Sequence, residues 1–147
     1  MEIKIRMATI ADMEAVHQLV NELAIYEKEP EAFVAPLSAY QEDFINGIFE
    51  VQVAETAGKI IGMVFYYMAY STWKGRMLYL EDFVVAQEWR GKGVGQMLFD
   101  RFLLTAREKK CAMVKWQVLD WNEPAIHFYE KNGATVEKGW YNVKIIF

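Results

Sequence analysis

Cysteine is nearly absent from this sequence, since Cys111 stands alone among 147 residues. A single cysteine excludes an intrachain disulfide framework and fits a reducing compartment. The sequence also lacks an apolar run of the roughly 20 residues that a membrane helix needs. At its start there is no basic segment followed by an apolar one, as an export signal would have. We therefore expect a cytoplasmic protein without a membrane partner.

An excess of positive charge is missing as well. The chain has 16 lysines and arginines against 20 acidic residues, a net charge of −4, and no basic cluster. Nucleic acid is therefore not an expected partner, because its phosphates demand Lys and Arg. His17 and His127 have no Cys or His companion at ligand spacing, so we expect no metal site. The acidic balance is compatible with a cationic substrate.

Apolar and aromatic residues are plentiful, at 54% and 15% of the chain. A disordered chain would be poorer in both, so the composition predicts a well-packed globule. The length suits one compact domain, which would bury roughly 68–70% of its unfolded surface. We find no repeat and no long linker, and we predict a single domain over residues 1–147.

The pattern of apolar residues predicts an α/β fold with a mixed sheet of about seven strands and about four helices. Asn122 and Pro124 are typical of a helix start, and Thr9 with Asp12 of a cap before the first helix. We expect the sheet to be antiparallel in its first half and parallel around the third helix. The predicted strands cover residues 3–7, 49–56, 60–70, 77–85, 113–119, 135–138 and 142–147, and the helices follow residues 12, 38, 93 and 122.

A glycine-rich turn follows the strand that ends at Val85 and opens the helix that begins at Gly93. Such a turn can aim several backbone N–H groups at one point, which suits a pyrophosphate, and Arg90 and Lys92 add positive charge. The turn is neither a Walker A loop nor a dinucleotide fingerprint, because the residues and spacing differ. The alternative is that the glycines merely ease a tight turn.

Two adjacent carboxylates, Glu81 and Asp82, interrupt this same strand. A buried strand rarely carries such a pair without a partner or a task. Glu81 is the candidate general base, and Asp82 is expected to point to the other face of the strand, where it steers or anchors a substrate. The alternative is a structural pair bonded to Arg or to backbone.

Several motifs resemble a known enzyme family. The run RGKGVG at residues 90–95 fits the (Q/R)-x-x-G-x-(G/A) signature of the GNAT acetyltransferases. LYLEDF at 78–83 and WNEP at 121–124, with Phe128 and Tyr129, resemble the spermidine/spermine (diamine) acetyltransferases. STWKGR at 71–76 and VLDWN at 118–122 are more similar to the thialysine acetyltransferases. The resemblance covers nearly the whole chain.

The resemblance implies the GNAT fold, acetyl-CoA as donor, a primary amine as acceptor, direct transfer in a ternary complex and a homodimer. It implies that backbone groups of one strand bind the pantetheine arm, that the glycine turn holds the pyrophosphate, and that a later helix flanks the cofactor. The implied cofactor-binding residues are Phe83, Val84, Val85, Arg90, Gly91, Lys92, Gly93, Val94, Gly95, Gln96, Asn122, Pro124, Ala125 and Phe128.

The resemblance also implies catalytic and acceptor-binding residues. Tyr129 is the implied general acid, although a lone tyrosine is more often a core residue. Tyr26 and Glu27 correspond to an acceptor-binding pair, against the alternative of a solvated helix end. Trp73 and Trp140 suit an alkylammonium chain, against ordinary packing. The expected substrate-binding residues are therefore Tyr26, Glu27, Trp73, Glu81, Asp82 and Trp140.

One difference from the diamine acetyltransferases narrows the choice of acceptor amine. Those enzymes have an acidic residue where this chain has Ser71. That acid would help to bind a second ammonium group, so its absence favours a thialysine-like or lysine-like amine over a polyamine. Two alternatives stay open: an acetyltransferase for protein or peptide amines, and a non-catalytic acyl-CoA sensor.

Overall fold

In the computed structural model, which describes residues 2–147, five strands form one sheet in the order β1-β2-β3-β4-β5. The first four strands pair antiparallel with their neighbours, and β4 pairs parallel with β5 across the connection that contains α3. The predicted mixed sheet is therefore confirmed. The strands are β1 (Lys4–Met7), β2 (Glu50–Thr56), β3 (Lys59–Ser71), β4 (Gly75–Val85) and β5 (Met113–Lys115).

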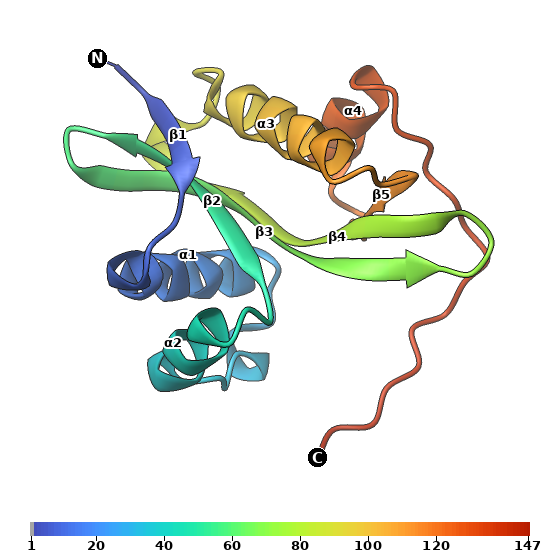
Figure 1. Cartoon of the computed structure of the whole chain (residues 1–147), viewed down its shortest axis with the longest axis horizontal. Coiled ribbons are helices and arrows are strands. Elements are labelled where there is room, and N and C mark those ends of the chain that lie inside the picture. Colours follow the sequence, from blue (N-terminus) through green and yellow to red (C-terminus); the bar gives the residue numbers. More distant parts are fainter. Residues whose placement is uncertain (1) are drawn as a thin grey trace. The chain divides into compact units, whose positions relative to one another are not determined.

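Helices cover both faces of this sheet. As Figure 1 shows, α1 (Met13–Tyr26) and α2 (Leu37–Ile45) lie on one side, and α3 (Val94–Glu108) lies on the other. Apolar residues of α1 pack with Val51 and Val53 of β2, while the Tyr66 ring of β3 contacts Phe102 of α3 at 5.4 Å between centroids. Because side chains alternate along a strand, β2 and β3 supply both layers of the core.

The start of α1 follows the predicted signals. The Thr9 N–H donates to Asp12 Oδ2 at 2.7 Å, and a short 3₁₀ turn (Ile10–Asp12) precedes the helix. Arg6 of β1 forms an ion pair with the same carboxylate at 2.7 Å, which lowers the pKa of Asp12. This network connects the first strand to the first helix.

By its contacts the chain forms two compact units, Met1–Trp116 and Gln117–Phe147. The first contains the sheet with α1, α2 and α3. The second contains α4 (Glu123–Lys131), where Asn122 Oδ1 accepts from Ala125 N at 3.4 Å and Gly133 lies just past the end with φ +88°. The prediction of one domain over residues 1–147 includes Met1, which lies outside the described residues, and it stays a prediction.

The predicted number of strands was wrong. The described part of the chain has five strands, because residues 135–138 and 142–147 form no strand, and β5 ends at Lys115 instead of 119. Val143 and Ile145 are 93% and 82% exposed. Alternating apolar residues report β-propensity, but a strand also needs a paired neighbour, which the pattern does not supply.

No helix among residues 2–147 is long and apolar enough to cross a membrane.

Candidate active site

A β-bulge determines where the two adjacent carboxylates lie. Phe65 of β3 pairs with Asp82 and Tyr66 pairs with Leu80, so Glu81 is an extra residue on β4 without a partner in the register. Asp82 therefore lies opposite Phe65, on the face that packs toward α1. The Tyr67 hydroxyl, which lies on this same face, donates to Glu81 Oε1 at 3.1 Å.

The expectation that Asp82 points to the face opposite Glu81 is therefore wrong. Alternation along a regular strand would separate neighbouring side chains, but an extra residue interrupts it and allows two successive side chains to share one face. Both carboxylates lie on the α1 side of the sheet, where they interact electrostatically.

Glu27, just past the end of α1, is the third member of what we call the acid cluster: Glu27, Glu81 and Asp82. Burial raises the pKa of Asp82 to about 7, with smaller contributions from the charges of Glu81 and Glu27. Burial and the Glu81 charge likewise raise the pKa of Glu27. Within residues 2–147, no Lys or Arg forms an ion pair with any of the three. Crowded carboxylates without a counter-ion favour a bound cation.

Three tyrosines flank the acid cluster, and none was among the predicted site residues. Burial, followed by the charges of Asp82 and Glu81, raises the pKa of Tyr40 on α2 to about 12. Burial and Glu81 also raise the pKa values of Tyr67, to about 12, and of Tyr79. Neutral phenols offer hydroxyl donors and aromatic faces, both of which suit an alkylammonium ion. No motif in the sequence marks these tyrosines. The pairing register of β3 and β4, which places Tyr67 opposite Tyr79, is what reveals two of them.

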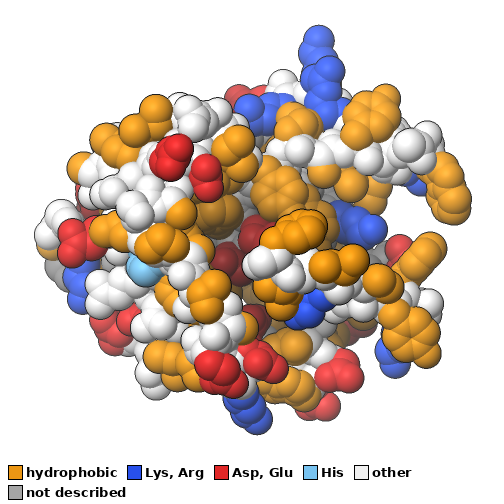
Figure 2. All heavy atoms as spheres, turned by 90° about the horizontal axis from the view of Figure 1, so that it is seen from below, with side chains coloured by type: hydrophobic (Ala, Val, Ile, Leu, Met, Phe, Trp, Pro, Cys, Tyr) orange, Lys and Arg blue, Asp and Glu red, His pale blue; other side chains and the backbone are white. Residues whose placement is uncertain are grey.

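Figure 2 shows the side of the sheet on which α1 and α2 lie, where both acidic and hydrophobic side chains occur. Asp82 pairs with Phe65 in the register, and Phe65 packs against the core cluster on this side. Apolar neighbours exclude water and thereby strengthen electrostatic interactions.

The second feature is the loop at residues 90–95, which we call the phosphate loop. Gly91 and Gly93 have φ values of +73° and +85°, in the left-handed region that favours glycine, and Gly93 is the N-cap of α3. A Cβ at either position would meet no atom within 4 Å, so the space beside this backbone is open. The first N–H groups of a helix point out of its N-terminus, where the helix dipole favours an anion.

The start of α3 lies against β4. A Cβ at Gly95 would be 3.6 Å from Phe83 Cζ and 3.7 Å from Val85 Cγ2. The pairing of β4 with β5 covers only Met77–Tyr79, so among the described residues β3 is the one strand paired with residues 80–85. The start of α3 thus lies beside the part of β4 that extends beyond its pairing with β5.

The end of α1 connects the two features. Arg90 Nε donates to Val85 O at 3.0 Å, and its Cζ lies 5.2 Å from the centroid of the Tyr26 ring. Tyr26 therefore contacts the phosphate loop, while the next residue, Glu27, belongs to the acid cluster. Lys92 Nζ of the same loop lies 5.1 Å from the ring of Trp89, the residue just before the loop.

The family model described as acetyltransferase (GNAT) family matches residues 13–134. This chain belongs to the acetyltransferase (GNAT) family. It is 34% identical over 152 residues to thialysine N-epsilon-acetyltransferase of Bos taurus, covering 95% of this chain and 89% of that protein. It is 31% identical over 150 residues to spermidine/spermine N(1)-acetyltransferase-like protein 1 of Homo sapiens, covering 94% of this chain and 22% of that protein.

A solved structure supports the fold of this acetyltransferase. An aminoglycoside acetyltransferase from an uncultured soil metagenomic sample matches with a TM-score of 0.81 and 18% identity, covering 99% of this chain and all of that one, 100%. At this identity the likeness shows the fold alone. The resemblance read from the motifs and the predicted fold class are both confirmed.

GNAT acetyltransferases use acetyl-CoA as the acetyl donor. The open, positive-φ backbone of the phosphate loop at the helix start suits a pyrophosphate, so this chain fits that donor. Bound there, acetyl-CoA supplies an acetyl group activated as a thioester. In the region that the structure describes, no cluster of His, Cys, Asp or Glu could hold a metal ion.

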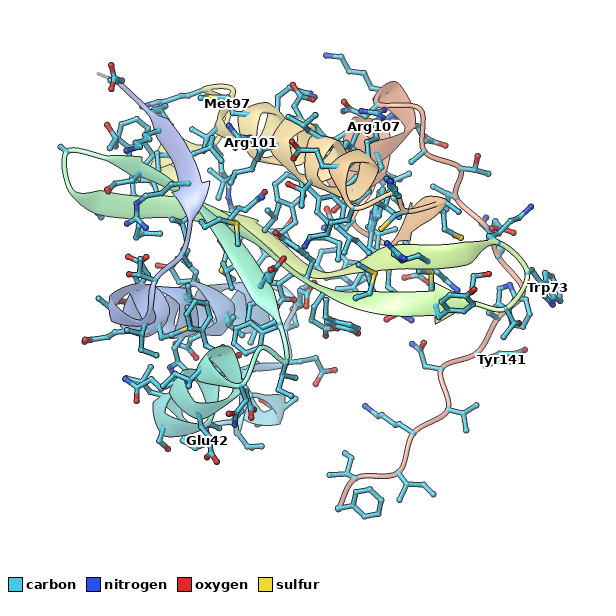
Figure 3. The ribbon with its side chains drawn as sticks, in the orientation of Figure 1. Glu42, Trp73, Met97, Arg101, Arg107 and Tyr141 are labelled. Carbon is cyan, nitrogen blue, oxygen red and sulfur yellow. The ribbon has the colours of Figure 1, made fainter. Side chains whose placement is uncertain are left out.

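Trp73 is not brought to the acid cluster. It lies at the turn that joins β3 and β4, where it is 87% exposed (Figure 3). β3 ends at Ser71, which is four residues and about 13 Å of extended chain beyond Tyr67, and Trp73 lies in the turn after that end. At the same turn, Ser71 Oγ accepts from the backbone N–H groups of Trp73, at 3.3 Å, and Lys74, at 3.1 Å. Ser71 thus stabilises the turn.

The remaining predicted site residues belong to the second unit. Asn122 caps α4, Pro124 and Ala125 lie in its first turns, and the Phe128 and Tyr129 rings contact each other at 5.8 Å. Tyr129 is the buried residue of α4. Trp140 follows the helix and is 84% exposed. Their roles in cofactor binding, catalysis and acceptor binding stay predictions.

Proposed function

We propose that this acetyltransferase moves the acetyl group of acetyl-CoA directly to the primary amine of a small, lysine-like molecule. N-acetylation of small-molecule amines is the activity that the family match and the relatives support. The observation that supports the choice of acceptor is the acid cluster, whose three carboxylates form no ion pair with a Lys or Arg among residues 2–147. A cationic amine supplies the missing charge.

Glu81 is the proposed general base. An alkylammonium ion has a pKa near 10.4, so it must lose a proton before its nitrogen can attack a thioester. Glu81 is exposed, hydrogen-bonded to Tyr67 and adjacent to Asp82. In the proposal it takes the proton directly or through one water, while Asp82 and Glu27 hold the rest of the cation.

The transfer itself forms one bond and breaks one. The free amine nitrogen bonds to the acyl carbon, the carbon–sulfur bond breaks, and the sulfur leaves with the electron pair. A thiolate has a pKa of about 8.5 on a cysteine-like reference, so a phenol can protonate it, and Tyr129 has this role by resemblance. A backbone N–H of residues 83–85 is proposed to polarise the acyl oxygen.

The donor is proposed to bind along β4 and the phosphate loop. Support for this is the open, positive-φ backbone at Gly91 and Gly93, next to the start of α3, which lies against Phe83 and Val85 of β4.

A lysine-like acceptor is favoured over a polyamine for two reasons. The relatives include proteins named thialysine N-epsilon-acetyltransferase, and the match to this chain covers most of their length, for example 89% of the Bos taurus protein. In addition, Ser71 gives the turn between β3 and β4 no carboxylate with which to bind a second, distant ammonium group.

The test is a CoA-release assay over thialysine, lysine, spermidine, putrescine, an aminoglycoside and a lysine-containing peptide. We expect the highest kcat/KM for thialysine or lysine, lower values for the polyamines and none for the peptide. A preference for the peptide would reject the small-molecule acceptor. Release with spermidine far above lysine would reject the lysine-like assignment while keeping the enzyme class.

Replacing Tyr129 with Phe separates an enzyme from a non-catalytic acyl-CoA sensor. We expect turnover to fall by about 100-fold because the departing sulfur loses its acid, while the Kd for acetyl-CoA is unchanged. Tyr141→Phe, at a 94% exposed position of the same unit, is the matched control. Equal turnover in both variants would remove Tyr129 from the mechanism.

The same proposal includes a cytoplasmic homodimer, as the family resemblance implies. A single cysteine is consistent with a reducing compartment. Light scattering of the purified protein at micromolar concentration tests the dimer, and a mass of 17.2 kDa, that of one chain, would reject it.

A further inference from the structure

Glu81 has one side-chain hydrogen bond in the described structure, and Tyr67 donates it at 3.1 Å. Glu81 is exposed and sits on the β-bulge, where it has no register partner on β3. A long, exposed carboxylate side chain samples several rotamers unless a contact selects one. The Tyr67 hydroxyl provides that contact.

Tyr67 is itself held firmly. Its ring stacks on that of Tyr79, with centroids 5.4 Å apart and planes at 23°, and the two residues are opposite each other on β3 and β4. Tyr67 is half-buried and packs against the core cluster on the α1 side. The donor is therefore fixed on a strand inside the sheet, and a functional group held by such an element is positioned more accurately than one on a loop.

We propose that Tyr67 is a positioning residue, which holds the Glu81 carboxylate in the orientation that accepts the proton of the bound amine. This inference rests on the proposed function. The hydroxyl is the part of Tyr67 that contacts Glu81. A phenylalanine at this position would lose that contact and keep the stack on Tyr79 and the packing toward α1. The role of the hydroxyl is to orient the proposed base.

The charges around Glu81 explain why such a donor matters. From α1 it faces Glu27, from α2 Tyr40, from β3 Tyr67, and from β4 Tyr79 and Asp82. Two of these groups are carboxylic acids, and a charge on either opposes a charge on Glu81. The hydrogen bond from the Tyr67 hydroxyl holds the Glu81 carboxylate in one place among these neighbours.

The experiment compares Tyr67→Phe with Tyr70→Phe, the same change three residues along β3 at a side chain that is 72% exposed. For Tyr67→Phe we expect kcat about 10-fold lower, while the Kd of the amine for the protein saturated with CoA changes less than about 2-fold. Tyr70→Phe should match the wild type in both measurements.

A double-mutant cycle tests whether Tyr67 acts through Glu81. In the Glu81→Gln background, Tyr67→Phe should cause no further loss of kcat, since the carboxylate that it orients is gone. A kcat equal to the wild type, or an undiminished 10-fold loss in the Glu81→Gln background, would overturn the proposal. Urea unfolding of each variant identifies any loss that comes from instability.

A readout without catalysis separates this inference from the proposed function. In protein labelled with ¹³C-tyrosine, the Tyr67 Cζ resonance should shift on Glu81→Gln and stay in place on Glu14→Gln, at an exposed site of α1. If the wild type acetylates none of the amines, the proposed function fails, and the positioning role fails with it. An unmoved Cζ resonance in an active enzyme would overturn the Tyr67 inference alone.

Discussion

Glu81 and Asp82 of the acid cluster lie a few residues before the phosphate loop along the chain, but the cluster and the loop are proposed to bind charged groups by different means. In the acid cluster these are carboxylate side chains, two of which a bulge brings to one face of β4. The phosphate loop, a few residues later, depends on backbone N–H groups that positive φ values at Gly91 and Gly93 expose. A site made of side chains is altered by a substitution that keeps the shape of the side chain and changes its chemical group. A site made of backbone groups is altered by a substitution that changes the backbone conformation.

The two regions also differ in how they are supported. Packing against α1 and the sheet supports the acid cluster, while the phosphate loop is tied down by the Arg90 hydrogen bond to Val85 O and the contact with Tyr26. Because Tyr26 and Glu27 are consecutive, a change at the end of α1 reaches both. Variants that affect one region and leave the other intact test this division.

The largest effect is expected from Glu81→Gln, which keeps the shape of the side chain and removes the proposed base. We expect kcat at neutral pH to fall by at least about 100-fold. Activity should return as the pH approaches the pKa of the amine in solution, because the amine then loses its proton without a base. The Kd for CoA should stay within about 2-fold, since the phosphate loop is untouched. Rate profiles from pH 6 to 10 and calorimetry provide both numbers. A pH profile parallel to that of the wild type would reject Glu81 as base.

Gly93→Ala changes the backbone of the phosphate loop and leaves the acid cluster alone. At φ +85° an alanine costs about 1 kcal/mol of strain, and relief of that strain turns N–H groups away, so CoA should bind about 10-fold more weakly. Gly58→Ala, at φ +76° in the turn between β2 and β3, is the matched control: similar loss of stability, unchanged affinity. Calorimetry with CoA decides, and equal affinities would argue against the loop as the phosphate site.

Asp82→Asn tests the crowding in the acid cluster. In the folded protein Asp82 holds its proton to about pH 7, whereas an unfolded aspartate releases it near pH 4. The folded state is therefore favoured below pH 4, and this advantage is lost as the pH rises to 7. At pH 8 we expect Asp82→Asn to be about 2 to 3 kcal/mol more stable than the wild type, with no difference at pH 4.

Urea unfolding at both pH values provides the measurement for Asp82, with Asp43→Asn on the exposed face of α2 as the control. A gain of equal size at pH 4 and pH 8 would mean that removal of charge is not its cause.

The smallest effect is expected where the two regions meet. Tyr26→Leu removes the ring that lies 5.2 Å from the Arg90 guanidinium but leaves the hydrogen bond to Val85 O. A cation–π contact at an exposed site contributes about 0.5–1 kcal/mol, so CoA should bind about 3-fold more weakly. Tyr26→Phe keeps the ring and should bind like the wild type. Loss of affinity in Tyr26→Phe would assign the effect to the hydroxyl instead.

Local signals in the sequence predicted most of the elements. Thr9 and Asp12 mark the start of the first helical segment, Asn122 with Pro124 starts α4, and the glycines at 91 and 93 fall where the chain adopts positive φ. Each of these depends on interactions between residues close in sequence. The strands predicted at 135–138 and 142–147 failed because a strand requires a distant partner.

The sequence by itself determined the family, the order of β4, phosphate loop and α3, and the presence of two neighbouring acids on the strand. Only the tertiary structure decided that Glu81 and Asp82 share a face, because a bulge exists only relative to the register of β3. It also decided that Glu27, Tyr40 and Tyr67 lie near them, since those residues come from three other segments of the chain. Local chemistry is encoded by adjacent residues, while the neighbours that tune it are set by packing across the sheet.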